Sequence, residues 1–129
     1  MLRIGALKIK AQLFCGDERA IGPGRADLLD AIDRHGSISA AGRALGMSYR
    51  YTWLLVDAMN RCFAERLVMT HAGGARLSDN GRRVLGAYRA VEAALVDAAR
   101  AHGALAELEA LMLPTPRLPG DGVAEGVAE

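Results

Sequence analysis

Hydrophobic residues follow two different spacings along this chain, and the change between them predicts where strands give way to helices. Between residues 4 and 14, apolar side chains alternate with polar ones, which is the period of a half-buried strand. The apolar set is Leu7, Ile9, Ala11 and Leu13. Gly16-Asp17 predicts a turn, after which Arg19–Ile21 forms a short partner strand in an N-terminal hairpin.

Three short helices are predicted after Gly22-Pro23-Gly24, where the alternation stops. The first covers Arg25–Arg34 and ends at Gly36, and the second covers about Ile38–Leu45 with Ser37 as its N-cap. The third begins after Ser48, which caps it, and ends near Cys62 or Ala64. Its inward face is predicted to contain Thr52, Leu55, Val56, Met59 and Phe63.

A glycine hairpin and a long helix complete the predicted order. Leu67–His71 and Ala75–Leu77 are expected to pair across Gly73-Gly74, and Ser78 caps a helix from Asp79 to about Met112. A helix-turn-helix followed by such a hairpin is a winged helix-turn-helix. The fold is therefore predicted to be mainly α with small β elements. We expect the N-terminal hairpin and winged helix in residues 1–77, a dimerisation helix in 78–113 and a disordered tail in 114–129.

The last predicted helix carries apolar positions separated by alternating steps of four and three residues. This heptad spacing indicates pairing with another helix or surface. Its partner could be the first helix or the N-terminal strands of the same chain. A helix of roughly 30 residues extends about 45 Å, which favours a homodimer interface. The seam consists of Val84, Tyr88, Val91, Leu95, Ala98, His102 and Leu105.

Charge is distributed unevenly behind a formal net charge of +1. From Arg34 to Arg89 the chain has nine basic and three acidic residues, a local charge of +6, which suits a polyanionic partner such as DNA. Cys15 and Cys62 lack metal-ligand or CxxC spacing and are expected to be buried free thiols. No signal peptide or membrane-spanning run is recognised, so a cytoplasmic location is expected.

The central segment resembles the DNA-binding domain of ModE-type molybdate-responsive regulators, which is similar to the winged helix-turn-helix of LysR-type bacterial regulators. The resemblance lies in GSIS at 36–39, G-x-SY at 46–49, Trp53, Met59-Asn60, the Gly73-Gly74 wing and L-S-x-x-G at 77–81. It implies binding to double-stranded DNA. ModE-type regulators carry molybdate-binding domains for which this chain has no room, so we expect no cofactor here. The chain is then an isolated DNA-binding subunit, senses by another route, or has a separate effector-sensing partner.

Several side chains are candidates for DNA contact. Arg50 occupies the best position for a base or phosphate contact, since arginine is the commonest reader of guanine. Tyr49 either packs on the DNA backbone or a thymine methyl or anchors the turn, and Trp53 either contacts DNA or is half-buried. The remaining candidates are Ser37, Ser39 and Ser48 at helix starts, His71 and Arg76 on the wing, and Arg82 with Arg83 on the last helix.

These patterns predict a homodimeric, sequence-specific transcription regulator that binds a palindromic operator. Enzyme function is not expected, because the sequence has no nucleophile elbow, phosphate loop or metal-ligand spacing. The alternative is a winged helix that binds other proteins and has no DNA affinity of its own, which the near-neutral total charge leaves open. Steep salt dependence of binding to duplex DNA would distinguish the two functions.

Overall fold

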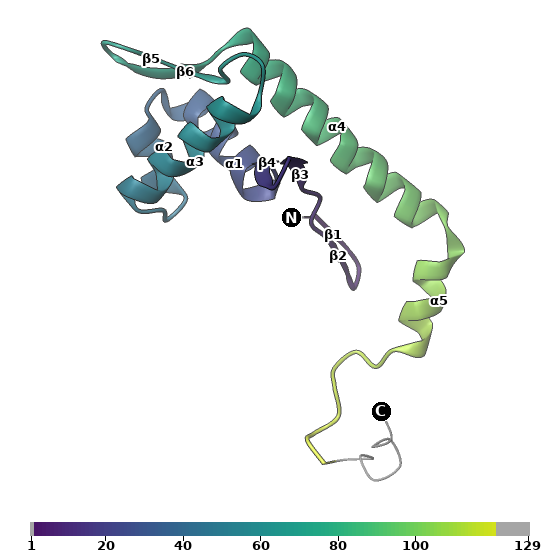
Figure 1. Cartoon of the computed structure of the whole chain (residues 1–129). Helices are drawn as coiled ribbons and strands as arrows, with labels where there is room; N and C mark the ends of the chain where they lie inside the picture. Colours follow the sequence, from purple (N-terminus) through teal and green to yellow (C-terminus); the bar gives the residue numbers. More distant parts are fainter. Residues whose placement is uncertain (1, 121–129) are drawn as a thin grey trace.

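The computed structural model describes residues 2–120 and confirms a mainly α fold built around a winged helix-turn-helix. Figure 1 shows α2, α3 and the β5–β6 hairpin gathered at one end of α4, with α5 at the other end. In chain order the elements are β1 (Leu2–Ile4), β2 (Leu7–Ile9), β3 (Leu13–Cys15), β4 (Glu18–Ile21), α1 (Pro23–His35), α2 (Ile38–Ala44), α3 (Tyr49–Cys62), β5 (Val68–His71), β6 (Gly74–Leu77), α4 (Asp79–Ala101) and α5 (Gly103–Leu111).

The N-terminal region contains two hairpins where the alternation predicted one long strand and a return. β1 pairs antiparallel with β2 across a turn at Gly5, whose φ is 58°, and β3 pairs with β4 across Gly16, whose φ is 61°. Residues 10–12 belong to no strand. The prediction of a continuous strand was wrong because Ala11 turns toward α4, where its carbonyl accepts a 2.7 Å hydrogen bond from the Tyr88 hydroxyl.

The helix-turn-helix begins and ends close to the predicted residues. α1 starts at Pro23, two residues earlier than expected, because proline suits the first turn of a helix. It ends at Gly36, whose φ of 70° permits the left-handed C-cap. The predicted caps are confirmed, since Ser37 accepts from the Ala40 amide and Ser48 accepts from the Tyr51 amide.

Helix α3 crosses α2 at very short range because residue 42 has no side chain. A Cβ atom at Gly42 would overlap Oγ1 of Thr52 and would lie 2.9 Å from its Cγ2. Thr52 is fully buried, and its hydroxyl donates a 2.7 Å hydrogen bond to the Ser48 carbonyl. The predicted inward face of α3 is confirmed, with Phe63 packed against the core as a partly buried residue. This packing of the inward side chains fixes the direction in which the opposite face of α3 points.

The wing is held at both of its ends. At the start of β5, the Asn60 carboxamide oxygen accepts from the Leu67 amide at 2.9 Å and from the Val68 amide at 3.1 Å. At β6, the Ala75 amide donates a 2.9 Å hydrogen bond to the carbonyl of Gly36 at the α1–α2 junction. A Cβ atom at Gly74 would collide with that carbonyl, so the close approach requires glycine there.

The predicted long C-terminal helix is divided into two. α4 ends at Ala101, and His102 adopts an extended conformation with φ −89° and ψ 129°. Its Nδ1 atom accepts a 3.2 Å hydrogen bond from the Ala104 amide and so caps α5. Gly103 follows directly, and glycine weakens a continuous helix. α5 returns toward the first hairpin, where Glu109 accepts a 2.7 Å hydrogen bond from the Ala6 amide.

The predicted disordered tail lies partly outside the described residues, which end at 120. Residues 114–120 contain no helix or strand, in agreement with the proline and glycine content of this segment. Residues 121–129 lie outside the described part of the chain.

Both cysteines are free thiols, but the prediction that both are buried was wrong. Cys15 is exposed on β3 and Cys62 is half-buried at the end of α3. Burial raises the pKa of Cys62, and its interaction with the neighbouring Cys15 thiol adds to the effect. The exposure of Cys15 follows from the position of β3, all of whose residues face solvent.

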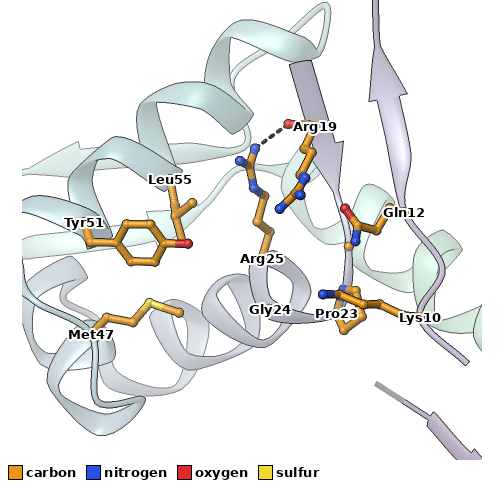
Figure 2. A pocket seen from close by; sticks show the side chains of 10 residues that line it. Lys10, Gln12, Arg19, Pro23, Gly24, Arg25, Met47, Tyr51 and Leu55 are labelled. Atoms are coloured by element: carbon orange, nitrogen blue, oxygen red, sulfur yellow. Dashed lines mark hydrogen bonds between the residues drawn. The ribbon is translucent and has the colours of Figure 1, made fainter. Parts of the chain in front are cut away.

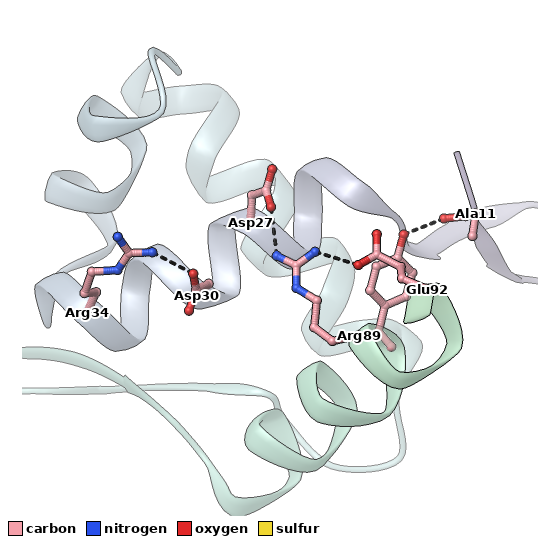
Figure 3. Close-up of polar contacts among 7 residues, drawn as sticks. Ala11, Asp27, Asp30, Arg34, Arg89 and Glu92 are labelled. Atoms are coloured by element: carbon pink, nitrogen blue, oxygen red, sulfur yellow. Dashed lines mark hydrogen bonds and ion pairs between the residues drawn. The ribbon is translucent and has the colours of Figure 1, made fainter. Parts of the chain in front are cut away.

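Helix α4 is fastened to the core by an aromatic residue and an ion-pair network. Figure 3 shows Arg89 of α4 between Asp27 of α1 and Glu92. Arg89 lies 2.8 Å from Asp27 and 2.9 Å from Glu92, which is buried. Burial works against the charged guanidinium, but the hydrogen bonds that it donates to both carboxylates raise the pKa of Arg89 overall.

We expect Gly42→Ala to lower the free energy of unfolding by about 1–3 kcal/mol, because a methyl group there overpacks the contact with Thr52. Urea denaturation measures the change. Gly86→Ala is the matched control, since it also replaces a helical glycine but has no neighbouring atom within 4 Å. The control should be neutral or stabilising by up to about 1 kcal/mol. Equal effects of the two substitutions would contradict the close crossing of α2 and α3.

A second prediction concerns Tyr88, whose pKa is raised to about 12 by burial and by the Glu92 carboxylate. Since the folded state holds the phenol proton more tightly than the unfolded chain, this stabilisation is complete below about pH 10 and is lost as the pH rises toward 12. An ultraviolet titration of tyrosinate should show one step with this raised pKa among the three tyrosines. Tyr88→Phe should remove that step and Tyr49→Phe should keep it; the opposite result would contradict the assignment.

Candidate nucleic-acid interface

The first turns of α3 present an exposed aromatic and basic surface. Tyr49 is 68% exposed and Trp53 is 37% exposed, with ring centroids 6.2 Å apart and planes tilted by 55°. Arg50, which lies between them in the sequence, is also exposed. Since Thr52 and Leu55 hold the opposite side of α3 in the core, these three side chains are directed outward. This geometry fits a helix that enters the major groove with its N-terminal residues foremost.

Arg50 is available for an external partner. Among residues 2–120, no carboxylate lies within 4 Å of it. Asp57, the acidic residue nearest to it along the outward face, forms a 2.9 Å ion pair with Arg61 instead. Arg43 and Arg76 are likewise exposed and unpaired within the described range. The guanidinium donors of Arg50 are therefore free to bind a base edge or a phosphate.

The three candidate serines lie at helix starts, where two of them already cap the helices. The Ser37 hydroxyl accepts from the Ala40 amide at 3.1 Å, and the Ser48 hydroxyl accepts from the Tyr51 amide at 3.1 Å. Ser39 is half-buried in the first turn of α2. A hydroxyl that accepts a capping hydrogen bond retains its own proton as a donor, so capping is compatible with phosphate contact.

The wing candidates lie on the exposed hairpin. The Nδ1 atom of His71 accepts a 3.2 Å hydrogen bond from the Gly73 amide and so takes part in the turn. Arg76 pairs across the hairpin with Met69 and is exposed. Arg82, in contrast, lies 3.9 Å from Asp33 and 3.6 Å from Asp79, so its charge is partly balanced within the chain. Arg83 is exposed beside it.

Sequence reasoning did not assign Leu54 to the interface. Leu54 is 54% exposed and lines a shallow hollow with Tyr49, Arg50, Trp53 and Asp57. An outward-facing leucine on an otherwise polar helix face was the available signal. The hollow gives the interface an apolar part that could receive a thymine methyl group.

The seven seam residues do not form one continuous stripe. Val84 and Tyr88 pack on the core of their own chain, which matches the intramolecular alternative that the heptad spacing left open. Val91, Leu95 and Ala98 are exposed on the second half of α4. His102 lies at the break after α4, and Leu105 is half-buried on α5. The exposed part of the seam is therefore confined to about two turns of α4.

Two other kinds of feature are missing from the described part of the chain. Among residues 2–120, no group of three or more His, Cys, Asp or Glu side chains is arranged to hold a metal ion. No helix within the same range has the length and apolar composition needed to span a membrane.

Comparison with known proteins agrees with this geometry. Residues 25–82 match the bacterial regulatory helix-turn-helix protein family of the lysR type, a family of regulators and not of enzymes. The chain is 41% identical over 78 residues to the molybdenum transport protein ModE of Azotobacter vinelandii, covering 57% of this chain and 29% of the relative. It is 44% identical over 78 residues to the molybdenum-pterin-binding protein MopB of Rhodobacter capsulatus, again covering 29% of that protein. The chain thus spans less than a third of the length of these relatives.

Proposed function

Because residues 25–82 form a helix-turn-helix domain of the LysR type, resembling ModE proteins, we propose that this protein is a transcription regulator that binds double-stranded DNA as a homodimer. The observation that carries the proposal is the exposed first turn of α3. Tyr49, Arg50 and Trp53 face outward there, and no acidic side chain neutralises Arg50 within the described residues. We propose that this turn reads base edges in the major groove.

Sequence-independent contacts are proposed for the residues around α3. Ser37, Ser39 and Ser48 would donate to phosphates at the starts of α2 and α3, where helix dipoles also favour negative charge. His71 and Arg76 would approach the flanking backbone from the wing. Arg82 is the weakest member of this set, because phosphate must compete there with Asp33 and Asp79.

The homodimer is proposed to form along the second half of α4. Val91 is 47% exposed and Leu95 is 37% exposed, and Ala98 continues the same helix face. Burial of such a stripe against its symmetry mate would remove apolar surface from water. A two-fold dimer requires an inverted-repeat operator whose half-sites lie one or more helical turns apart.

Two of the matched relatives carry molybdenum in their names, in connection with transport and with pterin binding. We propose no cofactor for the helix-turn-helix itself. Any response to molybdate would then originate outside the helix-turn-helix, either in another part of the protein or in a separate effector-sensing protein. This part of the proposal concerns regulation and is independent of DNA recognition by α3.

The alternative function is a protein-interaction module, and one observation favours it. Tyr49, Trp53 and Leu54 form an exposed apolar cluster of a kind that also occurs at protein interfaces. The unpaired Arg50 beside the cluster favours DNA. The two functions differ in salt dependence, because phosphate neutralisation releases counterions and makes DNA affinity fall steeply with salt.

The proposed function is tested first by selecting sheared genomic DNA on the purified protein at moderate salt and sequencing the bound fragments. An enriched inverted repeat is expected. Recovery of no sequence above background, together with salt-independent binding to proteins, would instead support the interaction module.

On the recovered operator, Arg50→Ala is expected to lower the binding free energy by about 1–3 kcal/mol, because a base-contacting arginine contributes this much discrimination. Fluorescence anisotropy with labelled operator at fixed salt measures the loss, and a variant operator library measures the sequence preference. Arg100→Ala, an exposed arginine on α4, is the control with the same loss of charge. Unchanged affinity and preference in Arg50→Ala would exclude base reading by this residue.

For the dimer, Leu95→Asp is expected to shift the protein toward monomer, since two carboxylates would oppose each other across the proposed interface. Sedimentation velocity over a range of concentrations measures the dissociation constant. Ala93→Asp is the matched control, because residue 93 is exposed on nearly the opposite side of α4. A dissociation constant altered equally by both substitutions, or by neither, would contradict dimerisation through this face.

A further inference from the structure

A cavity of about 160 Å³ lies beside α3, and the base contacts proposed above do not use it. It is bordered by the segment between β2 and β3, by β4, by the first turn of α1 and by α3. Figure 2 shows Tyr51 and Leu55 of α3 on one side, with Arg19, Arg25 and Lys10 on the other. The wing meets α1 at Gly36, at the opposite end of that helix.

The cavity is positively charged. Three of its lining side chains are cations, Lys10, Arg19 and Arg25, and none is an acid. Arg25 is 15% exposed, donates to the Arg19 carbonyl and lies 3.8 Å from Glu18, which lies outside the lining. Within residues 2–120, Lys10 and Arg19 have no carboxylate within 4 Å. The positive charges of Lys10, Arg19 and Arg25 repel one another because all three side chains line the same cavity, and an anion bound there would relieve that repulsion.

The polar groups around the cavity suit one chemical class of ligand. Ammonium and guanidinium groups are donors only, and the Gln12 amide and the Tyr51 hydroxyl can donate as well. Several converging donors match an anion that carries several acceptor oxygens. The side chains of Met47 and Leu55 form the apolar part of the wall.

We propose that this cavity binds a tetrahedral oxyanion of the phosphate type. Tyr51 follows Arg50 directly, so the cavity borders the same first turn of α3 that faces DNA in the proposed function. Two sources of the anion share this chemistry: a backbone phosphate flanking the half-site, or a free oxyanion. The first source rests on the proposed function and would extend the protein footprint on the side away from the wing. The second does not depend on DNA.

The test compares two double variants that each lose two positive charges. The first variant, Lys10→Gln with Arg19→Gln, removes the two cavity cations that have no carboxylate partner. The control variant, Arg3→Gln with Lys8→Gln, removes two cations that lie opposite each other in the β1–β2 hairpin and do not line the cavity. All four residues are exposed, and circular dichroism melts check that both variants fold. Tyr51→Phe, which removes only a hydroxyl, provides a third variant.

The first arm uses no DNA. Thermal unfolding is followed while inorganic phosphate or sulfate replaces chloride at constant ionic strength. If a free anion binds, the wild type and the Arg3/Lys8 variant show saturable stabilisation, the Lys10/Arg19 variant shows none, and Tyr51→Phe requires a higher anion concentration.

The second arm measures the dependence of operator affinity on salt. If a backbone phosphate enters the cavity, the slope of log affinity against log salt becomes shallower by about 0.9 for each phosphate that the Lys10/Arg19 variant no longer neutralises, and less so in the Arg3/Lys8 variant.

A positive result in either arm supports the cavity as an oxyanion site and identifies the source. The proposal is overturned if phosphate and sulfate give no saturable effect and the two double variants have equal salt slopes, or if the wild type binds neither these anions nor DNA. Failure of DNA binding alone would reject the proposed function while the first arm still decides on the cavity.

Discussion

The contact between Gly42 and Thr52 determines how the candidate nucleic-acid interface on α3 is presented. Helix α2 can approach α3 at this point only because residue 42 has no side chain, and the buried threonine occupies the space that a Cβ atom would need. Thr52 in turn bonds the Ser48 carbonyl, which fixes the first turn of α3 against the core. The outward direction of Tyr49, Arg50 and Trp53 follows from this arrangement, and so does the availability of a basic side chain for a ligand.

Much of the fold was predictable because it is specified by local chemistry. The capping serines and Gly36 as a C-cap each act within a few residues, and the structure confirms them. The wing hairpin is also present, but its turn lies at Ala72-Gly73 and not at the predicted Gly73-Gly74, because Gly74 belongs to β6 and packs against the Gly36 carbonyl. The break at His102 was missed because the heptad spacing continues through it, while the capping bond to Ala104 depends on the backbone geometry around Gly103. The division of residues 4–14 was missed in part because the hydrogen bond that Ala11 accepts in the break between β2 and β3 comes from Tyr88, 77 residues away.

The candidate interface was predictable in position but not in charge balance. The basic window from Arg34 to Arg89 indicated a polyanionic partner, yet several of its arginines are paired with carboxylates of the same chain. Sequence alone does not distinguish Arg61, held by Asp57, from Arg50, which has no such partner among the described residues. The cavity beside α3 was not foreseen at all, since Lys10, Arg19 and Arg25 are brought to Tyr51 only by the tertiary packing of the N-terminal strands.

The two anchors of the wing have a thermodynamic consequence for ligand binding. Asn60 fixes the beginning of β5 and the Gly36 carbonyl fixes β6 at Ala75, while the residues of the tip, His71–Gly73, are exposed. A binding element that is already ordered loses little conformational entropy when its partner arrives. Most of the interaction energy gained at the wing is therefore retained as affinity and is not spent on ordering the hairpin.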